Sequence, residues 1–302
     1  MNKIVTLAGA VVAAAGLSVP AALGDPIVPF PGAHSGKVFV AAQTVTPTGA
    51  MSSQFAPGST VVFRAYAVDT KTHKLVTKKK AKLFYVKIPD QKKLKLKYKR
   101  KADVASGRFA WIGKWKVPSD YPTGVVAFKV LVKTKSKRSG SFSQAPVEAA
   151  QLTISTSPQL PFGNGPNTRT NQGSSKVDVA LYADTVNGSR PAGAEPRPLG
   201  CTQTNVFKRG EQLVLRTWGF EMRSGDVLSM DNVADAHFSV AGVPDIVLNW
   251  GGHGATGAKV WFWTNQWQIP TDYPLGDATI HIQFKTLGGK VGKLDYPVTI
   301  IP

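Results

Sequence analysis

Four side chains in the later part of the chain have the chemistry of soft metal ligands: Cys201, His237, His253 and His281. Cysteine and histidine suit copper or zinc. No two of these residues stand at a spacing typical of a metal site, and Cys201 is the only cysteine in the chain. A metal site near Cys201 and His253 is therefore one hypothesis, and a buried, unreactive thiol is the competing interpretation of Cys201.

Two aspartates, Asp120 and Asp272, each precede a Tyr-Pro pair. Two carboxylates hydrolyse a glycosidic bond only when they are held about 5–10 Å apart, and these two lie in different copies of a repeat described below. A turn is the better interpretation, because Asp side chains accept bonds from backbone N–H groups and Pro fixes φ. The chain also lacks a G-x-S-x-G elbow and a glycine-rich phosphate loop. The sequence therefore predicts no catalysis and no cofactor.

Lysine is the residue whose distribution is most uneven. Residues 37–155 contain 24 Lys and Arg against 5 Asp and Glu, whereas residues 156–302 contain 12 of each. From Lys93 to Lys99 lysines alternate with apolar residues, so a strand would present the lysines on one face. We predict a polyanion-binding surface made of eight lysines. They are Lys78, Lys79, Lys80, Lys82, Lys93, Lys95, Lys97 and Lys99.

These side chains are positioned by a tandem repeat. The segment Trp111–Gly124 reappears as Trp263–Gly276, and the same offset of 152 relates Arg64 to Arg216. A constant offset over such a length indicates one structural unit used twice. We place the copies at residues 37–155 and 177–302 and expect their closing strands near residues 150–155 and 296–301.

Each copy has the pattern of β-structure. Apolar residues alternate with polar ones over short runs, as in Ala278–Phe284, and Gly, Pro, Asn and Asp separate the runs. The repeated pattern Trp-x-Val/Ile-Pro-x-Asp-Tyr-Pro-x-Gly resembles immunoglobulin-like modules of bacterial exported proteins. This resemblance implies a surface or periplasmic setting and two antiparallel immunoglobulin-like β-sandwich domains. It implies no particular chemistry, because such sandwiches host unrelated functions.

The repeat separates the needs of the fold from those of function. Leu94, Leu96 and Tyr98 align with apolar residues of the second copy, whereas the lysines between them align with Asp245, Val247, Asn249 and Gly251. Clustered like charges repel one another, so their presence favours a role in binding. Solubility, or protection of an edge strand against aggregation, is the alternative.

Residues 1–24 are expected to be a signal peptide, because a basic start precedes an apolar stretch and a small-residue end. Residues 25–36 are expected to be a lead-in, and residues 156–176 a flexible linker that lets the two domains tumble semi-independently. No later stretch is apolar enough to cross a membrane. The mature chain is therefore expected in the periplasm, outside the cell or at its surface.

Five of the seven tryptophans lie in the second copy. Most recur at core-like positions and are expected to pack inside, whereas Trp218 falls on the outward register and is expected to be the exposed one. The expected partner is an anionic polymer: a cell-wall polymer, an acidic polysaccharide or nucleic acid bound without specificity. An acidic protein or peripheral contact with an anionic membrane is also open. The alternative function is an accessory subunit of an exported redox or metal enzyme.

Overall fold

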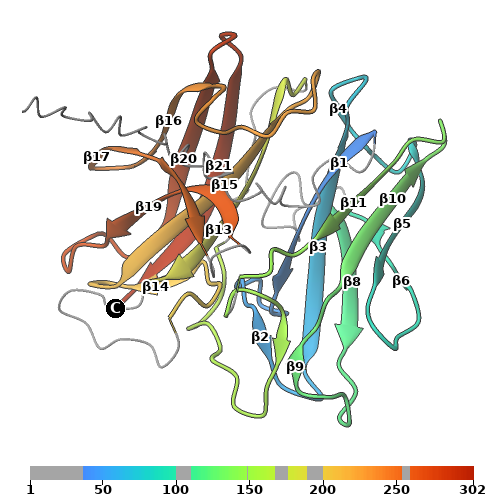
Figure 1. The fold of residues 1–302 in the computed structure, drawn as a ribbon. Helices are drawn as coiled ribbons and strands as arrows, with labels where there is room; N and C mark the ends of the chain where they lie inside the picture. The colour runs from blue at the N-terminus through green and yellow to red at the C-terminus, as the bar shows by residue number, and fades with distance from the viewer. Residues whose placement is uncertain (1–36, 100–109, 148, 167–175, 189–199, 254–258) are drawn as a thin grey trace, which may run out of the picture.

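The computed structural model describes residues 37–99, 110–147, 149–166, 176–188, 200–253 and 259–302. Every regular element in these residues is a β-strand, which confirms the all-β fold class (Figure 1). In the described part of the chain no helix is long and apolar enough to cross a membrane. The expected signal peptide and lead-in lie outside the described residues.

The strands of the first half precede residue 155. They are β1 (Val38–Val45), β2 (Gln54–Phe55), β3 (Thr60–Asp69), β4 (Lys74–Leu75), β5 (Ala81–Lys87), β6 (Leu94–Lys95), β7 (Lys97–Tyr98), β8 (Trp111–Lys116), β9 (Gly124–Val125), β10 (Lys129–Thr134), β11 (Ser139–Ser143) and β12 (Thr153–Ile154).

The strands of the second half follow residue 178. They are β13 (Val179–Asn187), β14 (Val206–Lys208), β15 (Gln212–Glu221), β16 (Val233–Val240), β17 (Val243–Val247), β18 (Asn249–His253), β19 (Val260–Gln268), β20 (Gly276–Thr286) and β21 (Val291–Ile301).

Each half is built from its own sheets, and no sheet of the described residues contains strands from both halves. In the first half the order β1-β3-β8-β7 faces the order β11-β10-β5-β6, and β2-β12-β9 forms a third, small sheet. In the second half β13-β15-β19-β18 faces β14-β21-β20-β16-β17. Ring contacts join the facing sheets, as between Phe63 and Phe128 at 5.0 Å and between Trp263 and Phe284 at 5.5 Å. Antiparallel pairing predominates.

The strand plan repeats with the sequence. The second-half counterparts β15, β16 and β18 begin 152 residues after β3, β5 and β7 respectively. The closing strand β12 pairs in parallel with β2, and the end of β21 pairs in parallel with β14. The closing strand expected at residues 150–155 is shortened to β12, and the one expected at residues 296–301 forms the end of β21. The two halves differ mainly in the length of two segments: the one that joins their first two strands, and the one that precedes their last strand.

The repeated Asp-Tyr-Pro segment forms a turn in both halves. The Tyr121 ring packs edge-on against Trp115 at 5.1 Å, and Tyr273 does the same against Trp267 at 4.9 Å. Each tyrosine hydroxyl donates to a backbone carbonyl 32 residues upstream. The glycine that ends the turn has φ of 123° at Gly124 and 107° at Gly276, a conformation that side chains with a Cβ rarely adopt. The motif is thus a structural corner of the sandwich.

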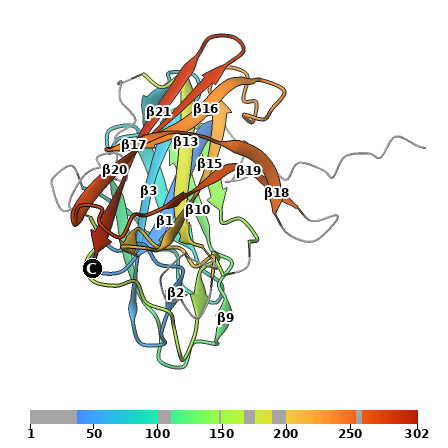
Figure 2. The same cartoon turned by 90° about the vertical axis from the view of Figure 1, so that its left-hand side faces the viewer.

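The two halves pack against each other, which corrects the expectation that they tumble semi-independently. Every residue of β1 and of β13 is buried, so both faces of these strands are covered. Figure 1 shows β13 and β15 beside β1 and β3, and the turned view in Figure 2 places the four strands behind one another. Phe39 of the first half contacts Phe220 of the second at 5.4 Å, and Phe142 contacts Tyr182 at 5.6 Å.

This contact also overturns the expected exposure of Trp218. Its side chain is 1% exposed and donates from Nε1 to the carbonyl of Trp261 at 3.1 Å. The aligned residue Tyr66 is 2% exposed and donates its hydroxyl to the carbonyl of Leu181 at 2.5 Å. The outward register of β3 and β15 points into the contact between the halves, so both faces of these strands are buried. The sequence of a strand that is buried on both faces is a nearly continuous apolar run.

The beginning of the expected linker lies against the protein. The backbone N–H of Gln159 donates to the side chain of Gln54 at 2.8 Å, and that of Gly165 donates to the carbonyl of Thr48 at 3.3 Å. Direct bonds also join the halves, as from Met51 N–H to the Asn205 side chain at 2.7 Å. Residues 167–175 of the expected linker lie outside the described residues. The described part of this segment is therefore anchored.

Candidate anion-binding surface

The lysine-rich strand predicted between residues 93 and 99 is divided between two sheets. Its first piece, β6, pairs with β5, and its second piece, β7, pairs with β8. Burial alternates as expected: the four lysines are exposed, whereas Leu96 between them is 2% exposed. Tyr98 packs edge-on against Trp111 at 5.2 Å. The apolar side chains thus fix the strand to the sandwich and leave the ammonium groups in solvent.

Five of the eight predicted lysines line one groove of about 550 Å³ beside this strand. Its floor is apolar and includes Leu96, Phe84 and Trp111. The lysines that line it are Lys78, Lys82, Lys95, Lys97 and Lys99. Lys95, Lys97 and Lys99 line the groove together although β6 and β7 belong to different sheets.

A second hollow, of about 360 Å³, lies on the other side of the same strand. Lys95, Lys97 and Lys99 line it as well, together with Lys114 of β8. The lysine row is therefore a ridge between two hollows. Lys114 was not predicted as a site residue. The period of two in Trp111–Lys116 could have indicated it, because Lys114 falls on the face opposite to Trp111 and Trp115.

The remaining predicted lysines lie outside this groove. Lys79 and Lys80 line a separate hollow of about 310 Å³. The Lys93 ammonium lies over the Tyr85 ring, 5.5 Å from its centroid. The structure therefore does not gather all eight side chains into one site.

The outer face of the sheet β11-β10-β5-β6 extends the basic surface beyond the predicted residues. Tyr85 is paired with Leu131 on one side and with Lys95 on the other, so all three share this face. Neighbouring pairs add more lysines to the same face. They are Lys87 opposite Lys129, and Lys133 opposite Leu83. These lysines were not among the predicted site residues, although Lys129, Leu131 and Lys133 stand two residues apart and therefore share one face of a strand.

Few carboxylates compensate these charges. None of the eight lysines forms an ion pair with a described residue. Asp69, the acidic residue at the hollow of Lys79 and Lys80, already bonds to Arg138 at 2.9 Å. Clustered positive charges without partners attract polyanions and release their counterions on binding. The geometry thus suits an extended anionic chain rather than a small apolar ligand.

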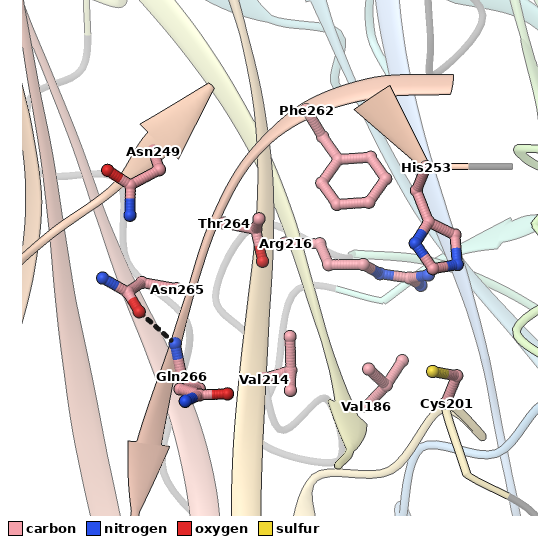
Figure 3. A pocket seen from close by; sticks show the side chains of 10 residues that line it. All are labelled: Val186, Cys201, Val214, Arg216, Asn249, His253, Phe262, Thr264, Asn265 and Gln266. Carbon is pink, nitrogen blue, oxygen red and sulfur yellow. Dashed lines mark hydrogen bonds between the residues drawn. The ribbon is translucent and has the colours of Figure 1, made fainter. Parts of the chain in front are cut away.

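The residues of the metal hypothesis come together in the second half. Cys201 and His253 line one pocket of about 330 Å³ with Arg216 and Phe262 (Figure 3). The described residues contain no group of three or more His, Cys, Asp or Glu placed to hold a metal ion. Because protein zinc sites use three or four protein ligands, Cys201 and His253 do not form such a site by themselves.

The other two histidines lie apart from that pocket. His237 bonds through Nδ1 to Asp235 at 3.0 Å, and His281 bonds through Nδ1 to Asp295 at 2.8 Å. Asp235 and His237 lie on the same strand, β16, whereas His281 and Asp295 lie opposite each other on β20 and β21; both pairs are at the surface of the second half. The four side chains considered as soft ligands are therefore not brought to one place.

The charged centre of the pocket is already neutralised. Arg216 donates from Nε and Nη2 to the two carboxylate oxygens of Asp184, both at 2.7 Å. Burial opposes the charge of Arg216, but the Asp184 carboxylate raises the pKa of the guanidinium above its ordinary value. Gln203 donates to the same carboxylate at 2.7 Å. The Arg216–Asp184 ion pair therefore has a structural role.

No protein-family model matches the chain, and no curated protein matches it in sequence. Among solved structures, one similar chain is the SGBP-B protein of the Bacteroides ovatus mixed-linkage glucan utilization locus, in complex with a mixed-linkage heptasaccharide. The identity is 10%, the TM-score is 0.18, and the match covers 83% of this chain and 43% of that one. The chain thus spans less than half the length of that protein. At this TM-score the likeness carries no argument about function.

Proposed function

We propose that this protein is a non-catalytic, exported binding or scaffold protein whose first half attaches to an anionic polymer. The observation that carries the proposal is the groove of five lysines, continued by a ridge and a sheet face of further lysines, with no described carboxylate bound to them. The expected signal peptide supports export. The resemblance to immunoglobulin-like modules of bacterial exported proteins, with domains near residues 37–155 and 177–302, belongs to the same proposal.

The kind of lysine surface favours attachment by charge rather than recognition of a sequence. Lysine acts as a point charge, whereas arginine forms two parallel bonds to a phosphate or to a base. Proteins that bind single-stranded nucleic acid usually stack successive bases on several aromatic rings. In the groove the aromatic residues Phe84 and Trp111 are buried, and Tyr98 packs against Trp111. The class of ligand that fits best is therefore an acidic polysaccharide or another cell-wall polyanion.

The test compares two full-length variants of equal net charge. One converts Lys93, Lys95, Lys97 and Lys99 to glutamine. The control converts four exposed lysines outside the surface to glutamine, namely Lys176, Lys208, Lys285 and Lys293. On a heparin column the control is expected to elute with the wild type and the first variant at clearly lower salt. Circular dichroism checks that both variants keep their β-sheet. Equal elution of the two variants would assign the lysines to solubility.

A further inference from the structure

Among the described residues, Arg64 is a buried cation without a partner. The residue is 7% exposed, and Nε is enclosed with no hydrogen-bond partner. No carboxylate of the described residues pairs with it. Because Nε is the enclosed nitrogen, we infer that solvent reaches the guanidinium through its terminal nitrogens, Nη1 and Nη2. A guanidinium carries five donors, and a buried charge is ordinarily paired.

The repeat supplies the matching arrangement with its partner in place. Arg216 stands at the same position of the second half, 152 residues on, and is paired across the strands with Asp184. In the first half the residue paired across the strands with Arg64 is Gln43. The amide of Gln43 thus occupies the position from which Asp184 reaches its arginine. One half has the arginine with a carboxylate, and the other has the arginine alone.

The charge of Arg64 and its place in the fold are consistent with a missing oxyanion. Nη2 lies beside the turn that follows β1, where a Cβ built on Gly49 would come within 3.2 Å. Burial lowers the pKa of the guanidinium to about 10, so the group is still charged at neutral pH. In the same cross-strand row, Ile112 separates Arg64 from Lys97. Two strand spacings place the backbone of Lys97 about 10 Å away.

We propose that Arg64 anchors an oxyanion site, in which a carboxylate or phosphate group of a ligand supplies the negative charge that Asp184 supplies in the second half. Charge-assisted bonds from the terminal nitrogens Nη1 and Nη2 would hold it, whereas Asp184 is held by Nε and Nη2 of Arg216. Arg64 does not line the lysine groove, and the site does not depend on the function proposed above. Its ligand is either a free small oxyanion or one anionic group of a longer chain that also reaches Lys97.

The test follows the Arg64 Nε–H signal by NMR in full-length protein. Inorganic phosphate or acetate is added at constant ionic strength, and Arg64→Gln identifies the signal. We expect a saturable shift in the wild type and in Gln43→Asn, which has the length of aspartate without its charge. Gln43→Asp supplies an internal carboxylate and is expected to show no shift. No saturable shift in the wild type, or an equal shift in Gln43→Asp, would overturn the site.

Thermal unfolding gives a second readout that does not rely on assigned signals. An oxyanion at about 100 times its Kd should raise the melting temperature of the wild type by about 5–10 °C relative to chloride. Gln43→Asp should melt higher without the ion and respond little to it. A response of Gln43→Asp equal to that of the wild type would contradict the proposal even if a variant at Arg64 failed to fold.

The variant with four lysines converted to glutamine separates the two sources of the oxyanion. An unchanged phosphate response in this variant supports a site for a free oxyanion, whatever becomes of polymer binding. A wild-type response to polyphosphate that exceeds the response to phosphate, and that this variant loses, supports a polymer-borne group. No response of Arg64 to either probe overturns the site and leaves the proposed function of the lysine groove to its own test.

Discussion

The two halves share a strand plan but place their charges differently. In the first half a row of lysines follows β6 and β7 and lines a groove without carboxylate partners. In the second half the corresponding strands β17 and β18 carry Asp245, Val247, Asn249 and Gly251 at the aligned positions. Since the second half forms its sandwich without these lysines, the fold does not require them. We therefore assign a role in binding, rather than in folding, to these lysines.

A second contrast lies where the halves meet. Arg216 is neutralised by Asp184, whereas the equivalent Arg64 has only Gln43 opposite it. Both arginines lie on strands that are largely buried. The halves therefore use one buried arginine in two ways, as an internal ion pair in one half and as an unpaired cation in the other.

The largest expected effect comes from removing a ring at the contact between the halves. Trp218→Ala should lower the free energy of unfolding by about 3–5 kcal/mol, because the indole is 1% exposed and packs against Tyr182 and Phe262. Denaturant titration measures this loss. The control Leu83→Ala changes a side chain that is 46% exposed and should stay within about 0.5 kcal/mol. Equal effects of the two substitutions would mean that Trp218 is not buried by the docked halves.

The contrast between the two arginines gives the next prediction. Asp184→Asn leaves Arg216 charged and buried without its carboxylate and should cost about 3–5 kcal/mol of unfolding free energy. Arg64→Gln removes a buried charge that has no partner, so it should be neutral or stabilising without added oxyanion. Denaturant titration in a chloride buffer compares them. A larger loss from Arg64→Gln than from Asp184→Asn would contradict the account of the two sites.

A smaller effect is expected at the hydrogen bond from Tyr66 to the Leu181 carbonyl. Tyr66→Phe keeps the ring but removes the hydroxyl that joins the halves, and should cost about 1–2 kcal/mol because the carbonyl stays buried. Denaturant titration measures it. Tyr85→Phe serves as the control, since the Tyr85 ring lies on the lysine face rather than between the halves. A similar loss in the control would mean that this bond does not contribute to docking.

The smallest effect concerns His73 and Asp178, which bond across the halves at 2.7 Å. This bond lowers the pKa of Asp178 below its ordinary value of 3.8. A carboxylate whose pKa is lowered by folding stabilises the protein above the unfolded pKa, and this stabilisation is lost as the pH falls through the folded pKa. Because Asp178 is 46% exposed, the gain should stay below about 1 kcal/mol. Asp178→Asn should therefore be slightly less stable than the wild type at pH 6. The difference should vanish near pH 2, and a difference unchanged there would contradict the assignment.

Local patterns in the sequence were sufficient for the strands. Alternation along the copies predicted the all-β class, and the constant offset of 152 matches strands such as β3 and β15. The Asp-Tyr-Pro segment was correctly interpreted as a turn, because Pro fixes φ and the closing Gly adopts a positive φ. The inward and outward positions of Leu96 and its neighbouring lysines also followed from the period of two.

Features that depend on distant parts of the chain could not be predicted in this way. Trp218 was expected to be exposed because its register points away from its own sandwich, but it belongs to a buried cluster that contains residues of both halves. A signal was present, since Phe39, Tyr66, Tyr182 and Phe220 place large rings on those outward positions. The division of the lysine strand between two sheets, and the distance of Lys79, Lys80 and Lys93 from the groove, arise from tertiary structure rather than from spacing.

The most direct test of the lysine surface is the salt dependence of binding to a polymer of known charge, such as duplex DNA. Each lysine that displaces a counterion contributes about −0.9 to the slope of log K against log salt concentration. Converting Lys93, Lys95, Lys97 and Lys99 to glutamine should therefore make the slope shallower by about 3–4. The control with four lysines changed outside the surface should keep the wild-type slope. A slope that both variants change equally, or that neither changes, would contradict the assignment of polyanion binding to the lysine surface.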